Sequence, residues 1–304
     1  MAFPLGIIKA NLKNYNVWIA SKYINCIYGH QAHLFDIIDD DIWCCRDGLT
    51  EIQTISIKPE VFSHNLIDLI GLIKFMLKSN YYLIGNFNEY YIPRKKPYKE
   101  FDFIHDYVLF GYNDSEAQLK SAGYIDTQKY EKFDIGYANY LESIYKMGSS
   151  RVDLCFYRIN TDFEVKFDIE LVAQHMKDYI NSRCSTRDNN DYLYGISAWD
   201  MLAKYIQKNE KPFLDLRYTR VFMEHKSLMF SRLNVLLDKG YLHNKDMLEQ
   251  YCVEIVEQAR LIHHMCLKYN LSHNTDIVDR TYDIIKAINQ KEYNLLRDVI
   301  NSIS

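Results

Sequence analysis

The second half of the chain carries the strongest constraint on the fold, because its apolar residues recur at helical spacing from about Phe167 almost to the last residue. Short polar or glycine-containing segments such as NNDYLYG and KGYLHNK interrupt this spacing. The composition, with only 11 glycines and 5 prolines in 304 residues, also disfavours a turn-rich β sandwich. The sequence therefore predicts an all-helical C-terminal half, with helices over 168–183, 195–208, 217–239, 245–269 and 275–302.

The first half of the chain has a mixed pattern. Apolar spacing predicts one helix over 25–41, with Asn25 as its N-cap, and a second from Pro59 to Lys78. Two runs rich in β-branched and aromatic residues, 81–92 and 103–112, predict strands, and the following GYND predicts a turn. We therefore expect an α+β fold in which a mixed region, 1–160, precedes a helical region, 161–304.

Charge and cysteine usage exclude several classes of protein. The 36 basic and 40 acidic side chains give a net charge of −4, so neither a nucleic-acid partner nor a membrane partner is expected. No apolar run approaches the ~18 residues that span a bilayer, and the first residues lack the apolar segment of a signal peptide. The seven cysteines follow no repeating spacing, so we expect a cytoplasmic protein without a disulfide framework.

One cysteine and one histidine are candidates for nucleophilic catalysis. Cys26 stands at the start of the first predicted helix, where the helix dipole and free backbone N–H groups favour a thiolate. His105 begins the second predicted strand, about eighty residues later, from which an imidazole can serve a thiol as base. Taken alone, a free cysteine on a helix is more often a small buried hydrophobe, and a histidine beside an aromatic strand is more often a core group.

The same predicted helix also allows a metal site. Cys26, His30, His33 and Asp36 follow one another at intervals of 4, 3 and 3 residues, which places them along one helical face. Thiol, imidazole and carboxylate groups are ligands of zinc. His30 and His33 can equally cover a cleft floor or lie at the surface, so we expect no metal and no other bound cofactor.

Several segments together resemble a known family. A helix headed by a cysteine, a strand that ends in YYIP and the run HDYVLFGYND resemble the cysteine-protease-like domain of the butirosin-biosynthesis acyltransferase family. That domain is itself similar to papain-like and bacteriocin-leader peptidases. In the second half, YGISAWDML at 194–202 and the stretch over 215–236 resemble the helical region that follows the catalytic part in such proteins. The resemblance implies a papain-like catalytic region followed by the helical region.

The resemblance also implies roles for individual residues. Cys26 would take an acyl group from a carrier-protein thioester, and His105 would act as its base and then relay protons during aminolysis. The third residue of the family pattern, about eighteen positions after the histidine, falls on Gly123 here, and Asp126 is the nearest carboxylate. Either Asp126 orients His105, or the enzyme uses a dyad. The glutamine that donates to the oxyanion in papain-like enzymes is also missing, because Ala20 stands at its position.

The implied function is acyl transfer in nonribosomal-peptide-type antibiotic biosynthesis. The partners would be an acyl or peptidyl carrier protein, whose phosphopantetheine carries the thioester, and a small amine, with a diamine as one option. A cysteine peptidase or thioester hydrolase would use the same residues, and a noncatalytic carrier-binding scaffold could keep the same fold.

Two other features could serve such a substrate. Arg94, Lys95, Lys96 and Lys99 form a basic loop just before the His105 strand, either as a solvated loop or as a docking site for an acidic carrier protein. The apolar faces of the helical half, with Phe222 and Ile255 among their residues, could form a lid over the active site. They could also pack only against one another.

Overall fold

The computed structural model describes residues 2–30, 34–38, 50–58, 61, 68–125, 130–147, 153–186, 190–208 and 213–303. The chain divides into two compact units. The first, the β-rich unit, combines Met1–Lys13 with Cys44–Phe163. The second, the helical unit, combines Asn14–Trp43 with Glu164–Ser304. The division near residue 163 lies close to the expected boundary at 160, but the segment 14–43 belongs to the helical unit.

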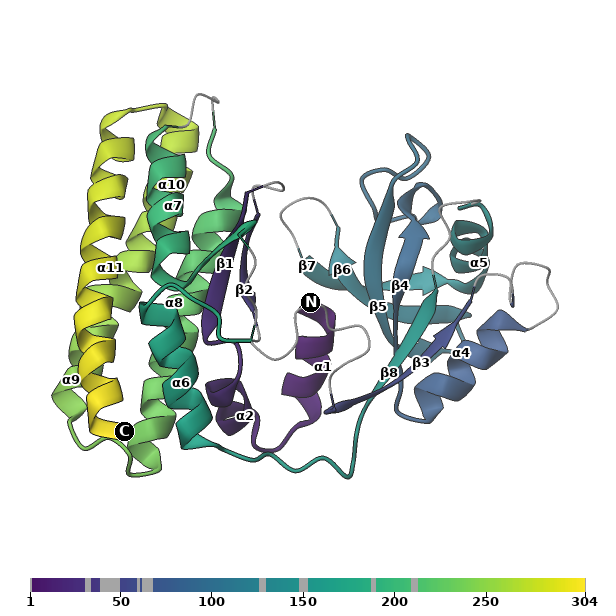
Figure 1. Cartoon of the computed structure of the whole chain (residues 1–304). Helices are drawn as coiled ribbons and strands as arrows, with labels where there is room; N and C mark the ends of the chain where they lie inside the picture. The colour runs from purple at the N-terminus through teal and green to yellow at the C-terminus, as the bar shows by residue number, and fades with distance from the viewer. Residues whose placement is uncertain are drawn as a thin grey trace. The chain divides into compact units, whose positions relative to one another are not determined.

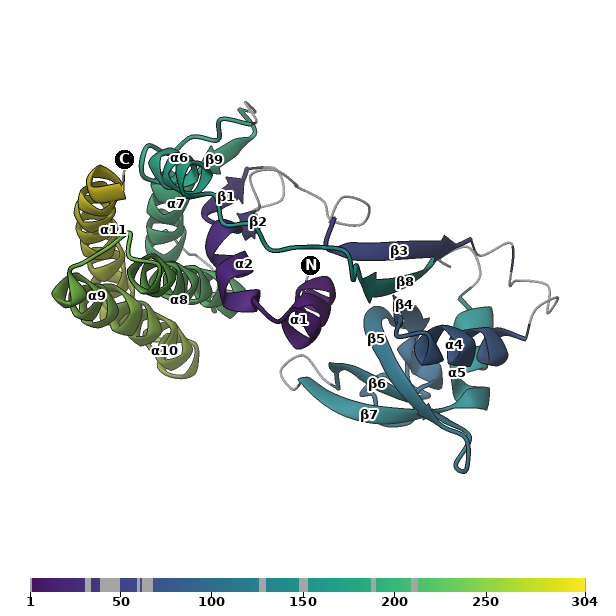
Figure 2. The same ribbon diagram turned by 90° about the horizontal axis from the view of Figure 1, so that it is seen from below.

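The β-rich unit is built on a six-stranded antiparallel sheet in the order β3-β8-β4-β5-β6-β7. Figure 2 shows β3 and β8 together at one edge and β6 and β7 toward the other. The strands are β3 (Ile52–Ile57), β4 (Tyr82–Asn88), β5 (Ile104–Asn113), β6 (Gln118–Tyr124), β7 (Tyr130–Gly136) and β8 (Leu154–Ile159). The helical segments are α1 (Ala2–Asn11), α4 (Leu69–Lys78), α5 (Tyr137–Tyr145) and the 3-10 turn η1 (Glu89–Tyr91).

One hydrophobic core joins this sheet to α4 and α5, which Figure 1 shows on the same side of the strands. Ile73 on α4 and Tyr140 on α5 share this core with Phe87, Tyr107 and other strand residues. Asp68 begins α4 by accepting a hydrogen bond from the backbone N–H of Gly71 at 2.9 Å. The helices therefore cover one face of the sheet, toward which alternate residues of β4 and β5 point.

The helical unit packs long helices against a small antiparallel sheet of order β2-β1-β9. Its strands are β1 (Asn25–Gly29), β2 (Leu34–Ile38) and β9 (Tyr192–Tyr194), and the short helix α2 (Tyr15–Ser21) precedes β1. The helices are α6 (Ile169–Ile180), α7 (Gly195–Gln207), α8 (Leu216–Asp238), α9 (Lys245–Tyr251), α10 (Glu257–Ser272) and α11 (Asp276–Ile303). In Figure 1, α7, α8, α10 and α11 run alongside one another, and their contacts form the bundle.

The structure confirms the mixed α+β architecture with a helical second half. The predicted helices over 168–183, 195–208, 217–239 and 275–302 correspond to α6, α7, α8 and α11, and the strands at 81–92 and 103–112 correspond to β4 and β5. The region 245–269 holds α9 and α10 separated by a π-helical turn, Cys252–Val256. The apolar helix faces proposed as a lid contribute Phe222 and Ile255 to the core of their own unit.

The predicted helix over 25–41 is wrong, because the described part of this segment forms the two strands β1 and β2. Every residue of β1 is buried, so the strand lacks the period-two alternation that would have revealed it. Ile27 pairs with Asp36 on β2 and with Tyr194 on β9. The sheet that stabilises β1 therefore depends on a partner strand about 165 residues away.

Two further expectations concern cysteines and membrane segments. All five cysteines in the described part of the chain are free, and Cys44 and Cys45 lie outside the described residues. None of the described helices is long and apolar enough to cross a membrane.

Candidate functional site

His105 lies near the start of β5, an interior strand of the six-stranded sheet. Its partner in the register with β4 is Phe87, and the side chains of Tyr107 and Leu109 project from the same face because they alternate along the strand. Tyr107 and Leu109 belong to the hydrophobic core, whereas the His105 side chain remains 31% exposed. On this face of β5 the imidazole of His105 is therefore partly exposed, whereas the side chains of Tyr107 and Leu109 are buried.

Two carboxylates flank this imidazole. The buried Glu89 places Oε1 3.5 Å from Nδ1 of His105, and the exposed Asp106 places Oδ1 3.4 Å from Nε2. Nδ1 is itself buried, and at 3.5 Å it lies at ion-pair distance, longer than a hydrogen bond. Catalytic hydrogen bonds are often longer in unliganded structures and tighten when substrate binds. The Nδ1 edge of His105 is thus buried beside Glu89, and the side chain as a whole stays partly exposed.

Lys95 completes this cluster from the loop after η1. Its ammonium lies 2.8 Å from Glu89 Oε1 and donates to the backbone carbonyl of Tyr124, and its side chain is fully buried. The rings of Phe133 and Phe87 lie 4.8 and 5.4 Å from Nζ, which adds cation–π stabilisation. Lys95 is therefore an internal ion-pair partner and not part of a solvated basic loop, whereas Arg94, Lys96 and Lys99 are exposed.

Aromatic side chains surround the open part of His105. Phe103 stacks on the imidazole with ring centroids 5.6 Å apart and an interplanar angle of 18°. Tyr124 approaches it edge-on at 6.4 Å and in turn contacts Tyr130 at 5.4 Å. Phe103, Tyr124 and Tyr130 are all among the exposed large hydrophobic residues. This apolar rim would lower the local dielectric around a bound substrate.

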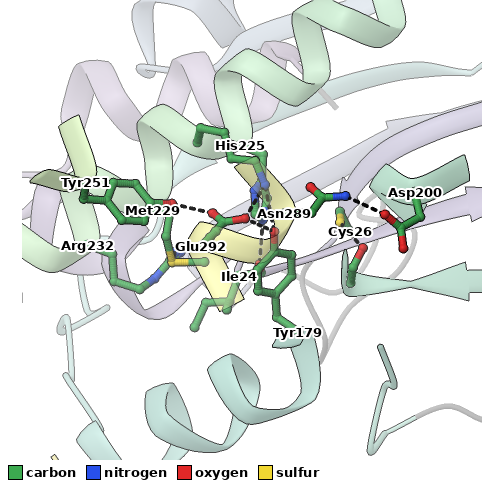
Figure 3. A network of polar contacts seen from close by, with 12 residues as sticks. Ile24, Cys26, Tyr179, Asp200, His225, Met229, Arg232, Tyr251, Asn289 and Glu292 are labelled. Atoms are coloured by element: carbon green, nitrogen blue, oxygen red, sulfur yellow. Dashed lines mark hydrogen bonds and ion pairs between the residues drawn. The ribbon is translucent and has the colours of Figure 1, made fainter. Parts of the chain in front are cut away.

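Cys26 lies in the helical unit, on β1, and not at a helix start. The residue is fully buried, and its thiol donates to the backbone carbonyl of Gly195 at 3.2 Å. Figure 3 shows it beside a network of buried polar side chains. Cys26 therefore does not begin a helix of its own, as the sequence predicted, and its thiol bonds instead to the first residue of α7.

The centre of that network is an ion pair between Lys226 on α8 and Glu292 on α11, both fully buried. The hydroxyls of Tyr179 and Tyr251 donate to the two oxygens of Glu292, and the Lys226 ammonium also donates to Tyr179 at 2.8 Å. Burial lowers the pKa of Lys226, while Glu292 and, more weakly, Cys26 act in the opposite direction. Cys26 therefore lies near a positive charge in this core.

Side chains of α8 bind the segment that leads into β1. Arg232 is fully buried and donates to the carbonyls of Ala20 and Lys22, both at 2.7 Å. His225, seven residues earlier, faces the Ile24 carbonyl with Nε2 at 2.9 Å. Burial, and then the neighbouring Lys226 charge, hold the pKa of His225 well below its usual value, so this imidazole is neutral at pH 7. These bonds explain why the segment 14–43 belongs to the helical unit.

The zinc alternative loses its geometric basis. The antiparallel register pairs Cys26 with Ile37 and Ile27 with Asp36, so Cys26 and Asp36 point to opposite faces of the sheet. His33 lies outside the described residues, and His30 is exposed at the end of β1. No group of three or more candidate ligands is placed to hold a metal ion within the part of the chain that the structure describes.

Sequence patterns indicate some residues of these clusters and miss others. They indicate Cys26, which lies in the helical unit, and His105, which lies in the β-rich unit. Asp126 lies outside the described residues, and Gly123 lies on β6. Glu89 is missed because the strand prediction extends through residue 92, whereas β4 ends at Asn88 and Glu89 begins η1. The available signal is the polar pair Asn88 and Glu89, at which the strand β4 ends and η1 begins.

No protein-family model matches the chain, and a comparison with curated proteins gives no significant match. The assignment of a function therefore depends on the clusters described above and on the resemblance seen in the sequence.

Proposed function

We propose that the protein is a cysteine acyltransferase that moves an acyl group from a carrier-protein thioester to an amine. The observation that carries this proposal is the arrangement at His105, in which a partly open imidazole has its buried Nδ1 facing the carboxylate of Glu89. An imidazole held in this way can accept and return protons through Nε2. The papain-like fold is part of the proposal, and an antiparallel sheet with the histidine on an interior strand supports it.

The proposed reaction has two balanced steps. The Cys26 thiol gives up its proton, the sulfur attacks the thioester carbonyl, and the carrier thiol leaves with a proton. An amine then attacks the acyl-cysteine, a base takes the amine proton, and the cysteine thiol is regenerated as the amide departs. The resemblance seen in the sequence gives the role of this base to His105. Exchange between thioesters is nearly isoenergetic, and amide formation is downhill, so the sequence of steps needs no nucleoside triphosphate.

The surroundings of Cys26 set a condition on this mechanism. The sulfur lies beside the buried network that holds the Lys226–Glu292 ion pair. The thiol is fully buried, so an acyl donor reaches it only after the residues that cover β1 move. Within the proposed family, the sequence resembles the amide-forming enzyme of closthioamide assembly, for which the acceptor would be a small amine such as a diamine.

The burial of Cys26 and its hydrogen bond to Gly195 favour a second candidate, a noncatalytic carrier-binding scaffold. A thiol that donates to a backbone carbonyl inside a core is typical of a structural cysteine. The two candidates differ in whether any acyl group leaves the carrier.

Product analysis across an amine titration separates the candidates. The full chain is mixed with an acyl-loaded carrier protein and increasing concentrations of a primary amine, and both amide and free acid are quantified. Water is present at about 55 M, so amide is expected to exceed free acid only if the site positions the amine and restricts water. Free acid that dominates at saturating amine for every amine tried would identify a hydrolase, and neither product above the carrier-only control would favour the scaffold.

A further inference from the structure

We propose that Glu89 positions the imidazole of His105, the role that the sequence argument gave to Asp126. The position of the imidazole follows from distances within the β-rich unit, whereas its effect on turnover rests on the proposed function. The main evidence is that one oxygen of Glu89 faces both the His105 Nδ1, at 3.5 Å, and the Lys95 ammonium, at 2.8 Å.

The backbone holds Glu89 in a fixed position relative to β5. Its N–H donates to the carbonyl of Phe103 at 2.8 Å, two residues before His105. The side-chain oxygen of Asn88 accepts from the N–H groups of Tyr90 and Phe103, at 3.1 and 3.2 Å, and so ties η1 to the chain entering β5. Glu89 and His105 therefore belong to one hydrogen-bonded unit, although sixteen residues separate them.

Lys95 holds the carboxylate from the other side. Its ammonium is buried between Glu89 and the Tyr124 carbonyl at the end of β6, so the side chain links η1 to a second strand. The Lys95 Nζ also lies 3.7 Å from the position that a Cβ on Gly123 would occupy. The family pattern expects its third residue at position 123, and this chain has a glycine there, next to the Lys95 ammonium.

This arrangement has a defined chemical consequence. A carboxylate facing Nδ1 favours the tautomer that carries the proton on Nδ1, which leaves Nε2 as the basic nitrogen. Asp106 is the matched control, because its carboxylate is as close to Nε2, at 3.4 Å, but its side chain is 57% exposed and is screened by water.

The direct test is an NMR measurement of the ¹⁵N chemical shifts of Nδ1 and Nε2 of His105 in the full chain, with the signals assigned by their loss in His105→Asn. These shifts report which nitrogen of the neutral ring carries the proton. The wild type is expected to carry it on Nδ1, and Glu89→Gln should raise the share of the tautomer protonated on Nε2, whereas Asp106→Asn and Asp126→Asn should change the ratio by clearly less. A tautomer ratio in Glu89→Gln equal to that of the wild type, or a larger change in Asp126→Asn, would overturn the proposal.

Kinetics give a second readout that separates this inference from the proposed function. In Glu89→Gln we expect kcat for amide formation to fall about a hundredfold, with KM for the acyl carrier unchanged. A changed tautomer ratio in a chain that forms no amide would keep the positioning role and reject the acyltransferase.

If Glu89→Gln does not fold, as judged by circular dichroism, Glu89→Asp replaces it. That change keeps the charge and the partner Lys95 but withdraws the carboxylate from Nδ1 by one methylene. The share of the tautomer protonated on Nε2 should again rise, and a tautomer ratio identical to that of the wild type would count against the proposal.

Discussion

Replacing Gly195 by alanine is expected to lower the free energy of unfolding by about 3 to 5 kcal/mol. Gly195 follows β9, begins α7 and has a φ of +57°, a conformation that L side chains rarely adopt. A Cβ at this position would lie 2.0 Å from the backbone oxygen of Tyr179. Because Tyr179 is also fixed by its hydroxyl in the Glu292 network, the backbone there has little freedom to yield.

Gly240 provides the matched control for this prediction. Its φ is +78°, also in the left-handed region, but nothing lies within 4 Å of a Cβ built on it. Gly240→Ala should therefore lower the free energy of unfolding only by the cost of holding an alanine in the left-handed conformation, about 1 to 2 kcal/mol. Urea unfolding of the wild type and both variants, followed by circular dichroism, measures the difference. Equal losses in the two variants would show that the contact with Tyr179 does not constrain the fold.

The second large effect is expected at His105. His105→Asn keeps a polar side chain of similar reach but removes the group that exchanges protons, so the rate of amide formation should fall by about a hundred- to ten-thousand-fold. The fold should be retained, because the His105 side chain is partly exposed and does not belong to the hydrophobic core. Chromatographic quantification of amide formed from acyl carrier and amine measures the effect.

His264 is the control for that substitution. It is exposed on α10, in the helical unit, so His264→Asn should leave the rate unchanged. A His105→Asn protein that forms amide within threefold of the wild-type rate, with an unchanged circular dichroism spectrum, would remove His105 from the chemistry.

Most of the helical half can be predicted from sequence because its signals are local. Asp168 and Asp215 each accept a hydrogen bond from a backbone N–H in the first turn of α6 and α8, and the apolar spacing follows directly. The π-helical turn after Tyr251 leaves no such signal. It lies where the Tyr251 hydroxyl reaches Glu292, a contact that depends on the packing of a helix 41 residues further on.

The strand at Cys26 cannot be predicted in the same way, because its cause is not local. Apolar residues near 25–38 fit a helical spacing as well as two short strands, and the choice is made by pairing with β9 and by bonds from Arg232 and His225. The candidate site also combines a residue with a local sequence signal and residues without one. His105 can be predicted from its own strand, whereas the role of Glu89 depends on a turn and on a buried Lys95 that the sequence presents as a solvated cation.

We expect the acyl group to pass through Cys26, and intact-mass spectrometry shows whether it does. The full chain is mixed with acyl-loaded carrier protein in the absence of amine, its intact mass is measured, and it is then digested for peptide mapping. The wild-type chain should gain the mass of the acyl group on Cys26, and Cys26→Ala should gain none. An adduct on another cysteine, or an unchanged mass while carrier thioester is consumed, would rule out Cys26 as the acyl carrier of the reaction.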